Sequence, residues 1–120
     1  MLQKQFRLKK QIEFNATYKQ RRIVSNDFLI AYIGKPKTNQ SFSTKIGIVV
    51  SKKLDKRAVK RNRIRRLISE AYRIAIKNNE INPKWISIIF IPKEIALETN
   101  YNKVYNAVIT CLNKADKKYA

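Results

Sequence analysis

Two strand-like segments joined by one long amphipathic helix restrict the possible folds of this chain more than any other feature. Residues 45–51 and 85–91 are rich in β-branched or aromatic side chains, which is typical of strands. The connection between them carries an apolar stripe at helical spacing, formed by Ile64, Leu67, Ile68, Ala71 and Ala75. A helix between two strands of one sheet makes a βαβ unit, so we expect these two strands to run parallel.

Shorter elements complete the predicted fold. Residues 28–33 predict a third strand, a short fourth is expected near residues 22–24, and a short helix is expected over residues 10–19. A last helix packing on the sheet is predicted from apolar residues at helical spacing, namely Val104, Ala107, Val108, Cys111, Leu112 and Ala115. The strands are almost continuously apolar, so we expect helices to cover one face of the sheet and to leave the other partly exposed.

The chain length sets the number of domains. A chain of 120 residues with 44% hydrophobic residues can build one modest core, and a second full domain has no room. Loops are expected at residues 34–43 and 78–84, both rich in turn-forming residues. We therefore predict a single-domain α/β sandwich over residues 1–120, with about four strands and three helices.

The charge balance points to a polyanionic partner. Lysine and arginine number 27 against 8 acidic residues, which gives a formal net charge of +19. Such a chain repels itself, and nucleic acid is the leading partner that would offset this repulsion. A membrane surface is the other possible partner, but the longest apolar runs, residues 28–33 and 86–91, are far too short to span a bilayer. The N-terminus lacks the apolar core of a signal peptide, and the single cysteine cannot form an internal disulfide, so a cytoplasmic location is expected.

The positive charge is concentrated where the long helix begins. Between Lys52 and Arg66 there are nine basic residues and one acidic residue, Asp55, which we predict as the N-cap. Cations at the positive end of a helix dipole cost roughly 0.3–1 kcal/mol each. A phosphate backbone lying against this end would offset that cost, because the free backbone N–H groups and the helix dipole attract an anion. Arginine side chains add planar, bidentate hydrogen bonds to the phosphate oxygens. The first turns carry little apolar surface and should project past the core, so we predict a nucleic-acid contact here rather than a merely solvated face.

Residues for autonomous catalysis are scarce. The chain has no histidine, and its eight carboxylates are dispersed along the sequence. A self-contained nuclease normally needs a histidine base or clustered carboxylates that hold metal ions. We therefore assign no catalytic and no metal-binding residue. Cys111 and Trp85 lie among apolar neighbours and are assigned to structure, and Glu94 and Glu98 are expected to be surface charges.

The sequence KIGIVVSKKLDKRAVKRNRIRRLISEAYR, Lys45 to Arg73, resembles the bacterial ribonuclease P protein family. It matches the strand, the Ser-Lys-Lys turn and the Arg-Asn-Arg helix of that family in order and spacing. Weaker similarity extends over FRLKKQIEFNATYKQ, WISIIFIPK and the last helix. The turn KQRRIVSN departs from the pattern because it lacks a glycine that many relatives carry there.

The resemblance implies a protein subunit that binds a catalytic RNA and the 5′ leader of precursor tRNA, and assists removal of the leader. The RNA would perform the hydrolysis with Mg²⁺ that it mainly holds itself, so the protein alone would bind no cofactor firmly. The implied partners are the catalytic RNA and precursor tRNA, with no membrane and no obligate protein partner. The implied fold contains a left-handed βαβ crossover, opposite to the usual hand.

The resemblance also assigns residues. One set of residues would face the catalytic RNA or lie near it. These residues are Ser51, Lys52, Lys53, Lys56, Arg57, Lys60, Arg61, Asn62, Arg63, Arg65 and Arg66. A cleft between the first helix and the sheet would hold the single-stranded leader with Phe14, Tyr18, Ile30 and Tyr32. Any base can stack on an aromatic ring, at about 1–3 kcal/mol per base. Phe14 and Ile30 fit core packing equally well, whereas the polar tips of Tyr18 and Tyr32 favour the cleft.

Two other functions fit a small basic protein. A purely structural nucleic-acid protein, such as a ribosomal component, would have no effect on RNA cleavage. An autonomous endonuclease would cut RNA without an RNA subunit, and one carboxylate substitution would abolish the cleavage.

Overall fold

A four-stranded mixed sheet lies at the centre of the computed structural model, which describes residues 6–39, 43–53, 57–81 and 83–119. The strands are β1 (Arg22–Ser25), β2 (Leu29–Ile33), β3 (Lys45–Ile48) and β4 (Ser87–Pro92), in the order β1-β2-β4-β3. β2 pairs antiparallel with both β1 and β4, and β3 pairs parallel with β4. The α/β fold and the parallel pair predicted from the sequence are therefore confirmed.

The connection between β3 and β4 contains the helix α2 (Ala58–Lys77). Its buried side chains include Ile64, Ile68, Ala71 and Ala75 of the predicted stripe, while Leu67 is half-buried. Residues 58–63 contribute no buried side chain, which confirms that the first turns project past the core. The left-handed crossover stays a prediction.

The predicted strand bounds differ from the observed ones at both ends of this unit. β3 ends at Ile48, although the Val49 N–H still donates to the Phe90 carbonyl over 3.0 Å. β4 begins at Ser87 instead of residue 85 and runs on to Pro92, which pairs with Leu29 at the strand end. Proline is tolerated at such an end because its missing N–H breaks no central ladder bond.

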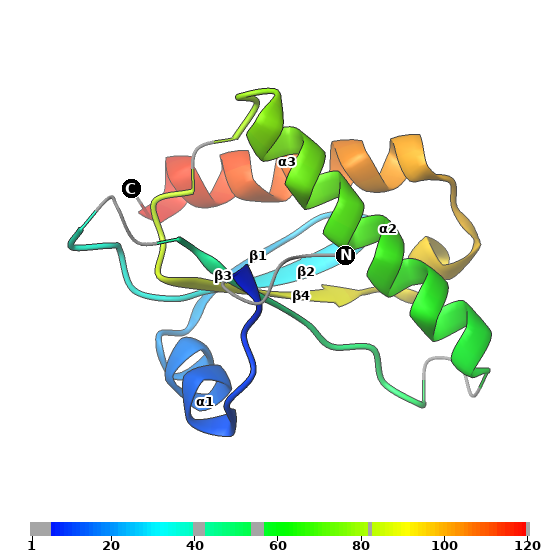
Figure 1. Cartoon of the computed structure of the whole chain (residues 1–120), viewed down its shortest axis with the longest axis horizontal. Helices are drawn as coiled ribbons and strands as arrows, with labels where there is room; N and C mark the ends of the chain where they lie inside the picture. The colour runs from blue at the N-terminus through cyan, green and yellow to red at the C-terminus, as the bar shows by residue number, and fades with distance from the viewer. Residues whose placement is uncertain (1–5, 40–42, 54–56, 82, 120) are drawn as a thin grey trace.

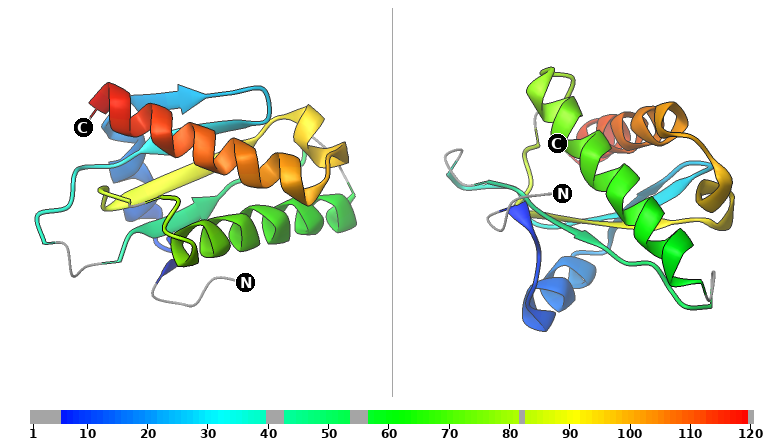
Figure 2. Two further views of the ribbon diagram at one scale, coloured as in Figure 1. Left: turned by 90° about the horizontal axis from the view of Figure 1, so that it is seen from above. Right: turned by 45° about the vertical axis from the view of Figure 1, so that its right-hand side comes forward.

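Two helices cover one face of the sheet. After β4, the 3-10 helix η2 (Glu94–Glu98) leads into α3 (Tyr101–Tyr119), which lies beside α2 over the sheet (Figures 1 and 2). All six apolar residues predicted to form the stripe of the last helix are buried. The main core therefore lies between the sheet and these two helices, and it includes Tyr72, Trp85 and Phe90.

The helix α1 (Gln11–Lys19) packs on the opposite face of the sheet and covers only one end of it (Figure 1). Thr17 is buried there, and its hydroxyl lies 2.5 Å from the hydroxyl of Ser87 on β4. The Glu13 carboxylate accepts from Lys45 Nζ over 2.9 Å, which ties α1 to β3 as well. The sheet is thus sandwiched between two unequal layers.

The turn from α1 to β1 uses a left-handed residue. Arg21 has φ of 53°, a conformation that favours glycine because it lacks a Cβ. This is the turn that lacks a glycine in the sequence, so Arg21 adopts the left-handed conformation at some conformational cost. The Arg21 N–H donates to the Tyr18 carbonyl over 3.1 Å and closes the turn.

Candidate nucleic-acid interface

The N-terminal end of α2 presents cations to solvent. The helix begins at Ala58, and the side chain of Arg57, the N-cap residue, makes no cap hydrogen bond. The first turn contains no acidic residue to complement the helix dipole. The prediction that Asp55 is the N-cap is wrong, because the helix begins two residues later and Arg57 is the N-cap residue. Asp55 itself and Lys56, a predicted contact, lie outside the described residues. An anionic partner is therefore the natural complement of this helix end.

Most of the predicted contacts to the catalytic RNA are exposed on the surface around this helix end. The exposed residues are Ser51, Lys52, Lys53, Arg57, Asn62, Arg65 and Arg66, and the half-buried ones are Lys60, Arg61 and Arg63. The turn before the helix is held by the Lys53 N–H, which donates to Ser51 Oγ over 3.0 Å. That bond fixes the backbone while Lys52 and Lys53 project outward. We call this set of ten residues the α2 basic surface.

Arg63, although part of this surface, forms hydrogen bonds within the fold. Its guanidinium donates to the carbonyl oxygens of Leu97 over 3.2 Å and Thr99 over 2.7 Å, joining α2 to the end of η2. Lys60 forms an ion pair with Glu98 of the same segment. Sequence reasoning placed both residues with the RNA contacts and missed these bonds, because η2 is distant in sequence and only the fold brings it beside α2.

The other predicted site lies on the sheet face that α1 partly covers. The rings of Tyr18 on α1 and Tyr32 on β2 pack edge to face, with centroids 4.8 Å apart. Ile30 is half-exposed two residues before Tyr32, and therefore points to the same face of the sheet. The structure thus brings Tyr18 and Tyr32 into contact, with Ile30 on the same face.

Phe14 lies further along α1, against β3. A Cβ atom on Gly47 would lie only 2.7 Å from Cε1 of the Phe14 ring, so the ring rests directly on the glycine backbone. Phe14 is half-buried and lines a small pocket at the edge of β3. The ring thus packs on the strand and also borders the pocket, and the choice between core packing and the leader cleft stays a prediction.

Local electrostatics follow the contacts of α1. The hydrogen bond from Lys45 is the main cause that holds the pKa of Glu13 below its ordinary value. Burial raises the pKa of Tyr18, and the neighbouring Tyr32 adds to this effect. Tyr18 therefore stays a neutral phenol at physiological pH, which suits a base-stacking surface.

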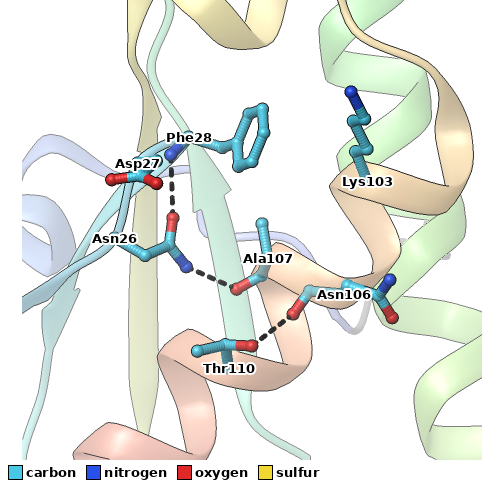
Figure 3. Close-up of a pocket in the computed structure, with 7 residues that line it drawn as sticks. All are labelled: Asn26, Asp27, Phe28, Lys103, Asn106, Ala107 and Thr110. Carbon is cyan, nitrogen blue, oxygen red and sulfur yellow. Dashed lines mark hydrogen bonds between the residues drawn. The ribbon is translucent and has the colours of Figure 1, made fainter.

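The pocket of about 300 Å³ between the β1–β2 turn and α3 is organised around Asn26 (Figure 3). Its Nδ2 donates to the Ala107 carbonyl over 2.9 Å and to Cys111 Sγ over 3.2 Å, while Oδ1 accepts from the Phe28 N–H over 2.9 Å. Asn26 thus pins the turn to α3, a role that the sequence did not reveal. Cys111 and Trp85 are buried, in agreement with the structural assignment.

Two negative findings apply to the described part of the chain only. Across residues 6–39, 43–53, 57–81 and 83–119, no three His, Cys, Asp or Glu side chains gather as a metal ligand set. None of the helices there combines the length and apolar content that a bilayer crossing requires. Glu94 and Glu98, expected at the surface, are both exposed.

Comparisons with known proteins agree on one family. A family model described as Ribonuclease P matches residues 2–116. The ribonuclease P protein component of Clostridioides difficile is 36% identical, over 91% of this chain and 90% of the relative. The corresponding protein of Alkaliphilus oremlandii is 33% identical, over 90% and 89%.

Solved structures share the fold. The Staphylococcus aureus RNase P protein is 31% identical and superposes with a TM-score of 0.73, covering 92% of this chain and 94% of that one. The RNase P protein of Thermotoga maritima, at 22% identity, has a TM-score of 0.74 over 90% and 96% of the two chains, which supports the likeness in fold.

Proposed function

The chain belongs to the ribonuclease P protein family, a component of a ribonucleoprotein that processes tRNA, and from this premise we propose a division of its surface. The α2 basic surface binds the catalytic RNA subunit. The sheet face beside α1 receives the single-stranded 5′ leader of precursor tRNA. The protein thereby assists the endonucleolytic cut that produces the mature 5′ end.

The observation that carries the RNA-binding part is the gathering of exposed cations at a helix N-terminus. Arg57 is exposed at this end, Arg65 and Arg66 are exposed further along α2, and Lys52 and Lys53 are exposed before the helix. Arginine forks bind phosphate oxygens in pairs, and the helix dipole adds attraction for the same anion. An anionic partner would relieve the repulsion among these cations. The folded protein is therefore preorganised for a phosphate backbone.

The leader assignment rests on Tyr18 and Tyr32. Their edge-to-face contact leaves two half-buried rings where α1 packs on the face of the sheet opposite α2 and α3. An unpaired base can stack on such a ring, whatever the base, because every base has a π-face. A leader of variable sequence needs this tolerance. Ile30 and Phe14 extend the same side of the molecule.

We assign the hydrolysis itself to the RNA subunit, with Mg²⁺ held mainly by the RNA. Three carboxylates of the described chain are engaged in ion pairs, namely Glu13 with Lys45, Glu70 with Arg73 and Glu98 with Lys60. A carboxylate fixed by a cation is a poor proton acceptor because its pKa is lowered, as it is for Glu13 and Glu70. These contacts favour a protein that binds and positions RNA.

Cleavage of a 5′-extended precursor tRNA at low Mg²⁺ tests this function. The protein alone, the catalytic RNA alone and their mixture are compared for cutting at the mature 5′ end. We expect efficient cleavage only from the mixture. Cleavage by the protein alone would instead identify an autonomous endonuclease, and a mixture no faster than the RNA alone would indicate a structural RNA-binding protein.

A further inference from the structure

The helix α1 has one fully buried side chain, and that side chain is polar. Of the nine residues of α1, all of them described, only Thr17 is buried. Ile12, the one branched aliphatic residue of this helix, is 73% exposed and adds little to the contact with the sheet. The rings of Phe14 and Tyr18 are half-buried. The most buried contact between α1 and the sheet is therefore the one that Thr17 makes.

The Thr17 hydroxyl belongs to a chain of hydrogen bonds with a fixed direction. Its Oγ1 donates to the Glu13 carbonyl over 2.9 Å, one turn back in α1. A hydroxyl has a single hydrogen to donate, so the bond of 2.5 Å between Thr17 and Ser87 is donated by Ser87 Oγ. Both residues are buried, and an unpaired hydroxyl there would cost free energy. The chain therefore holds α1 at one distance from β4.

The sheet leaves room for this bond at Gly34. The Gly34 N–H donates to the Ser87 carbonyl over 2.8 Å, so the two residues lie side by side. A Cβ atom on Gly34 would collide with Ser87 Oγ, and a side chain there would displace the hydroxyl. On its other side Ser87 pairs with Lys45 of β3, whose Nζ binds the Glu13 carboxylate. Glu13 and Thr17, one turn apart on α1, are thus tied to two neighbouring strands.

The tie between α1 and β4 lies directly beside the tyrosine pair. Tyr18 follows Thr17 in α1, and Tyr32 lies two residues before Gly34, so that both positions of this strand segment face α1. The two rings meet at 80°, with centroids 4.8 Å apart. An edge-to-face contact of this kind depends on the separation of the rings. The distance between α1 and the sheet therefore sets the shape of the surface that the two rings present.

We propose that Thr17 and Ser87 are positioning residues for the 5′ leader, because their buried hydrogen bond holds the Tyr18 ring against Tyr32. Both residues are buried, so RNA does not reach either hydroxyl and the bond acts through the rings. A hydrogen bond suits this task better than an apolar contact, because it fixes both a distance and a direction. The inference rests on the proposed leader site and adds the two residues that hold its rings in place.

Removal of either hydroxyl tests this role in the holoenzyme. Thr17→Val keeps the shape of the side chain, whereas Ser87→Ala removes the donor and leaves Thr17 its bond to the Glu13 carbonyl. We expect each variant to bind precursor tRNA with a leader about fivefold more weakly and leaderless tRNA as tightly as the wild type does. Thr17→Ser, which restores the hydroxyl, should recover most of the affinity. Unchanged leader affinity in both Thr17→Val and Ser87→Ala would overturn the proposal.

Thr44→Val controls for the loss of a buried hydroxyl elsewhere. Thr44 is 4% exposed, and its Oγ1 donates to the carbonyl of Trp85, a residue of the core between the sheet and the helices α2 and α3, over 2.7 Å. We expect Thr44→Val to lower the urea midpoint about as much as Thr17→Val and to leave leader affinity unchanged. An equal loss of leader affinity in the two variants would indicate general destabilisation and overturn the positioning role.

Two further measurements separate positioning from stability. In a double-mutant cycle, Thr17→Val added to Tyr18→Ala should change leader affinity by less than about twofold, because the ring on which it acts is absent. Ring protons that point at the face of another ring are shielded, so ¹³C-tyrosine labelling should show an upfield signal that Thr17→Val moves and Thr44→Val does not. Additive losses in the cycle, or an unmoved tyrosine signal in Thr17→Val, would refute the positioning role.

Substitution of the rings themselves separates this role from the leader site. If Tyr18→Ala and Tyr32→Ala leave leader binding unchanged, the proposed leader site is wrong and the positioning role falls with it. If both weaken leader binding while Thr17→Val and Ser87→Ala do not, only the positioning role is wrong and the leader site stands.

Discussion

Arg63 Nη2 donates a hydrogen bond of 2.7 Å to the Thr99 carbonyl oxygen, which joins the basic end of α2 to the residues just before α3. Nη1 of the same guanidinium donates to the Leu97 carbonyl over 3.2 Å. The α2 basic surface therefore contains an arginine that stabilises the fold. Stability and RNA binding can be separated by substitution within one helix.

Arg63→Ala should lower the free energy of unfolding by about 2 kcal/mol, because the variant cannot form the two charge-assisted hydrogen bonds to carbonyl oxygens. Arg66→Ala, three residues further on and exposed, should change it by no more than about 0.5 kcal/mol. Urea denaturation of both variants measures the difference. Arg63→Lys keeps the charge and should recover little, since it cannot reach both carbonyls. Equal stability of the two alanine variants would contradict the structural role of Arg63.

Exposed cations of the α2 basic surface should control the salt dependence of binding to the catalytic RNA. Replacing Lys53 and Arg66 with alanine should reduce the log–log slope of affinity against salt concentration by roughly 0.7–0.9 for each phosphate that the variant no longer neutralises. Lys77→Ala, at the opposite end of α2 and also exposed, is the matched control and should leave the slope unchanged. Filter binding at several salt concentrations provides the slopes. The same slope in all variants would exclude this helix end as the RNA-binding surface.

The Tyr18–Tyr32 pair should act only on substrates that carry a leader. Tyr18→Ala or Tyr32→Ala should weaken binding of precursor tRNA to the holoenzyme by about 1–3 kcal/mol, the value of one stacking partner, and leave leaderless tRNA unaffected. Tyr101 and Tyr105 form another pair, with centroids 5.9 Å apart on α3, so Tyr105→Ala controls for the removal of a paired aromatic ring. An equal weakening with leaderless tRNA would remove the leader assignment.

The fold was predictable from the sequence because its core positions repeat at regular spacing. The stripes of α2 and α3 are long, and the βαβ order follows from two apolar strands on either side of a helix. Strand ends were less predictable: β3 stops at Ile48 although apolar residues continue to Val50. Side-chain alternation does not mark where a ladder ends.

The site was predictable only as a set of residue types. The density of lysine and arginine indicated an anionic partner, but spacing within a helix cannot show that Arg63 and Lys60 contact η2. The contact of Phe14 with Gly47 is likewise invisible in the sequence, because the two residues belong to elements that meet only in the folded chain. Long-range contacts of this kind decide which side chains of the predicted site are engaged within the fold.

The Cys111 thiol should make stability depend on alkaline pH. Burial raises its pKa to about 11, and nearby Lys114 and Lys93 only partly oppose this effect. Because the folded pKa lies above the unfolded value of about 8.5, the thiol's contribution to stability is complete below the unfolded value and is lost as pH rises towards 11. The stability advantage of the wild type over Cys111→Ala should therefore shrink by about 2–3 kcal/mol between pH 8 and pH 11.

Denaturation at both pH values measures this change, and the comparison of two variants cancels the titration of lysines and tyrosines. The folded protein should also react slowly with a thiol reagent at pH 8, at a rate that rises with urea as the chain opens. Fast labelling without urea, or an advantage independent of pH, would contradict the buried, neutral thiol.

Tyr119 should protect the free edge of the sheet. Among the described residues, β1 pairs only with β2 in the sheet. The Tyr119 hydroxyl accepts a hydrogen bond from the Ile23 N–H over 3.1 Å and can donate one to the Ile23 carbonyl oxygen over 3.3 Å. Lys114 Nζ donates to the Ser25 carbonyl over 2.8 Å on the same edge. An unpaired strand edge is a template for pairing with another chain, so these side chains of α3 block association.

Tyr119→Phe should therefore promote association through β1. Tyr105→Phe removes a hydroxyl that lies 3.5 Å from Asn78 Nδ2, away from the edge, and should associate no more than the wild type. The net charge of +19 opposes association at low ionic strength, so the dimer fraction of Tyr119→Phe should rise with salt as the repulsion is screened. Sedimentation equilibrium over a range of salt and protein concentrations measures this. A Tyr119→Phe variant that stays monomeric at high salt would show that Lys114 alone, or the twist of the strand, is enough to protect the edge.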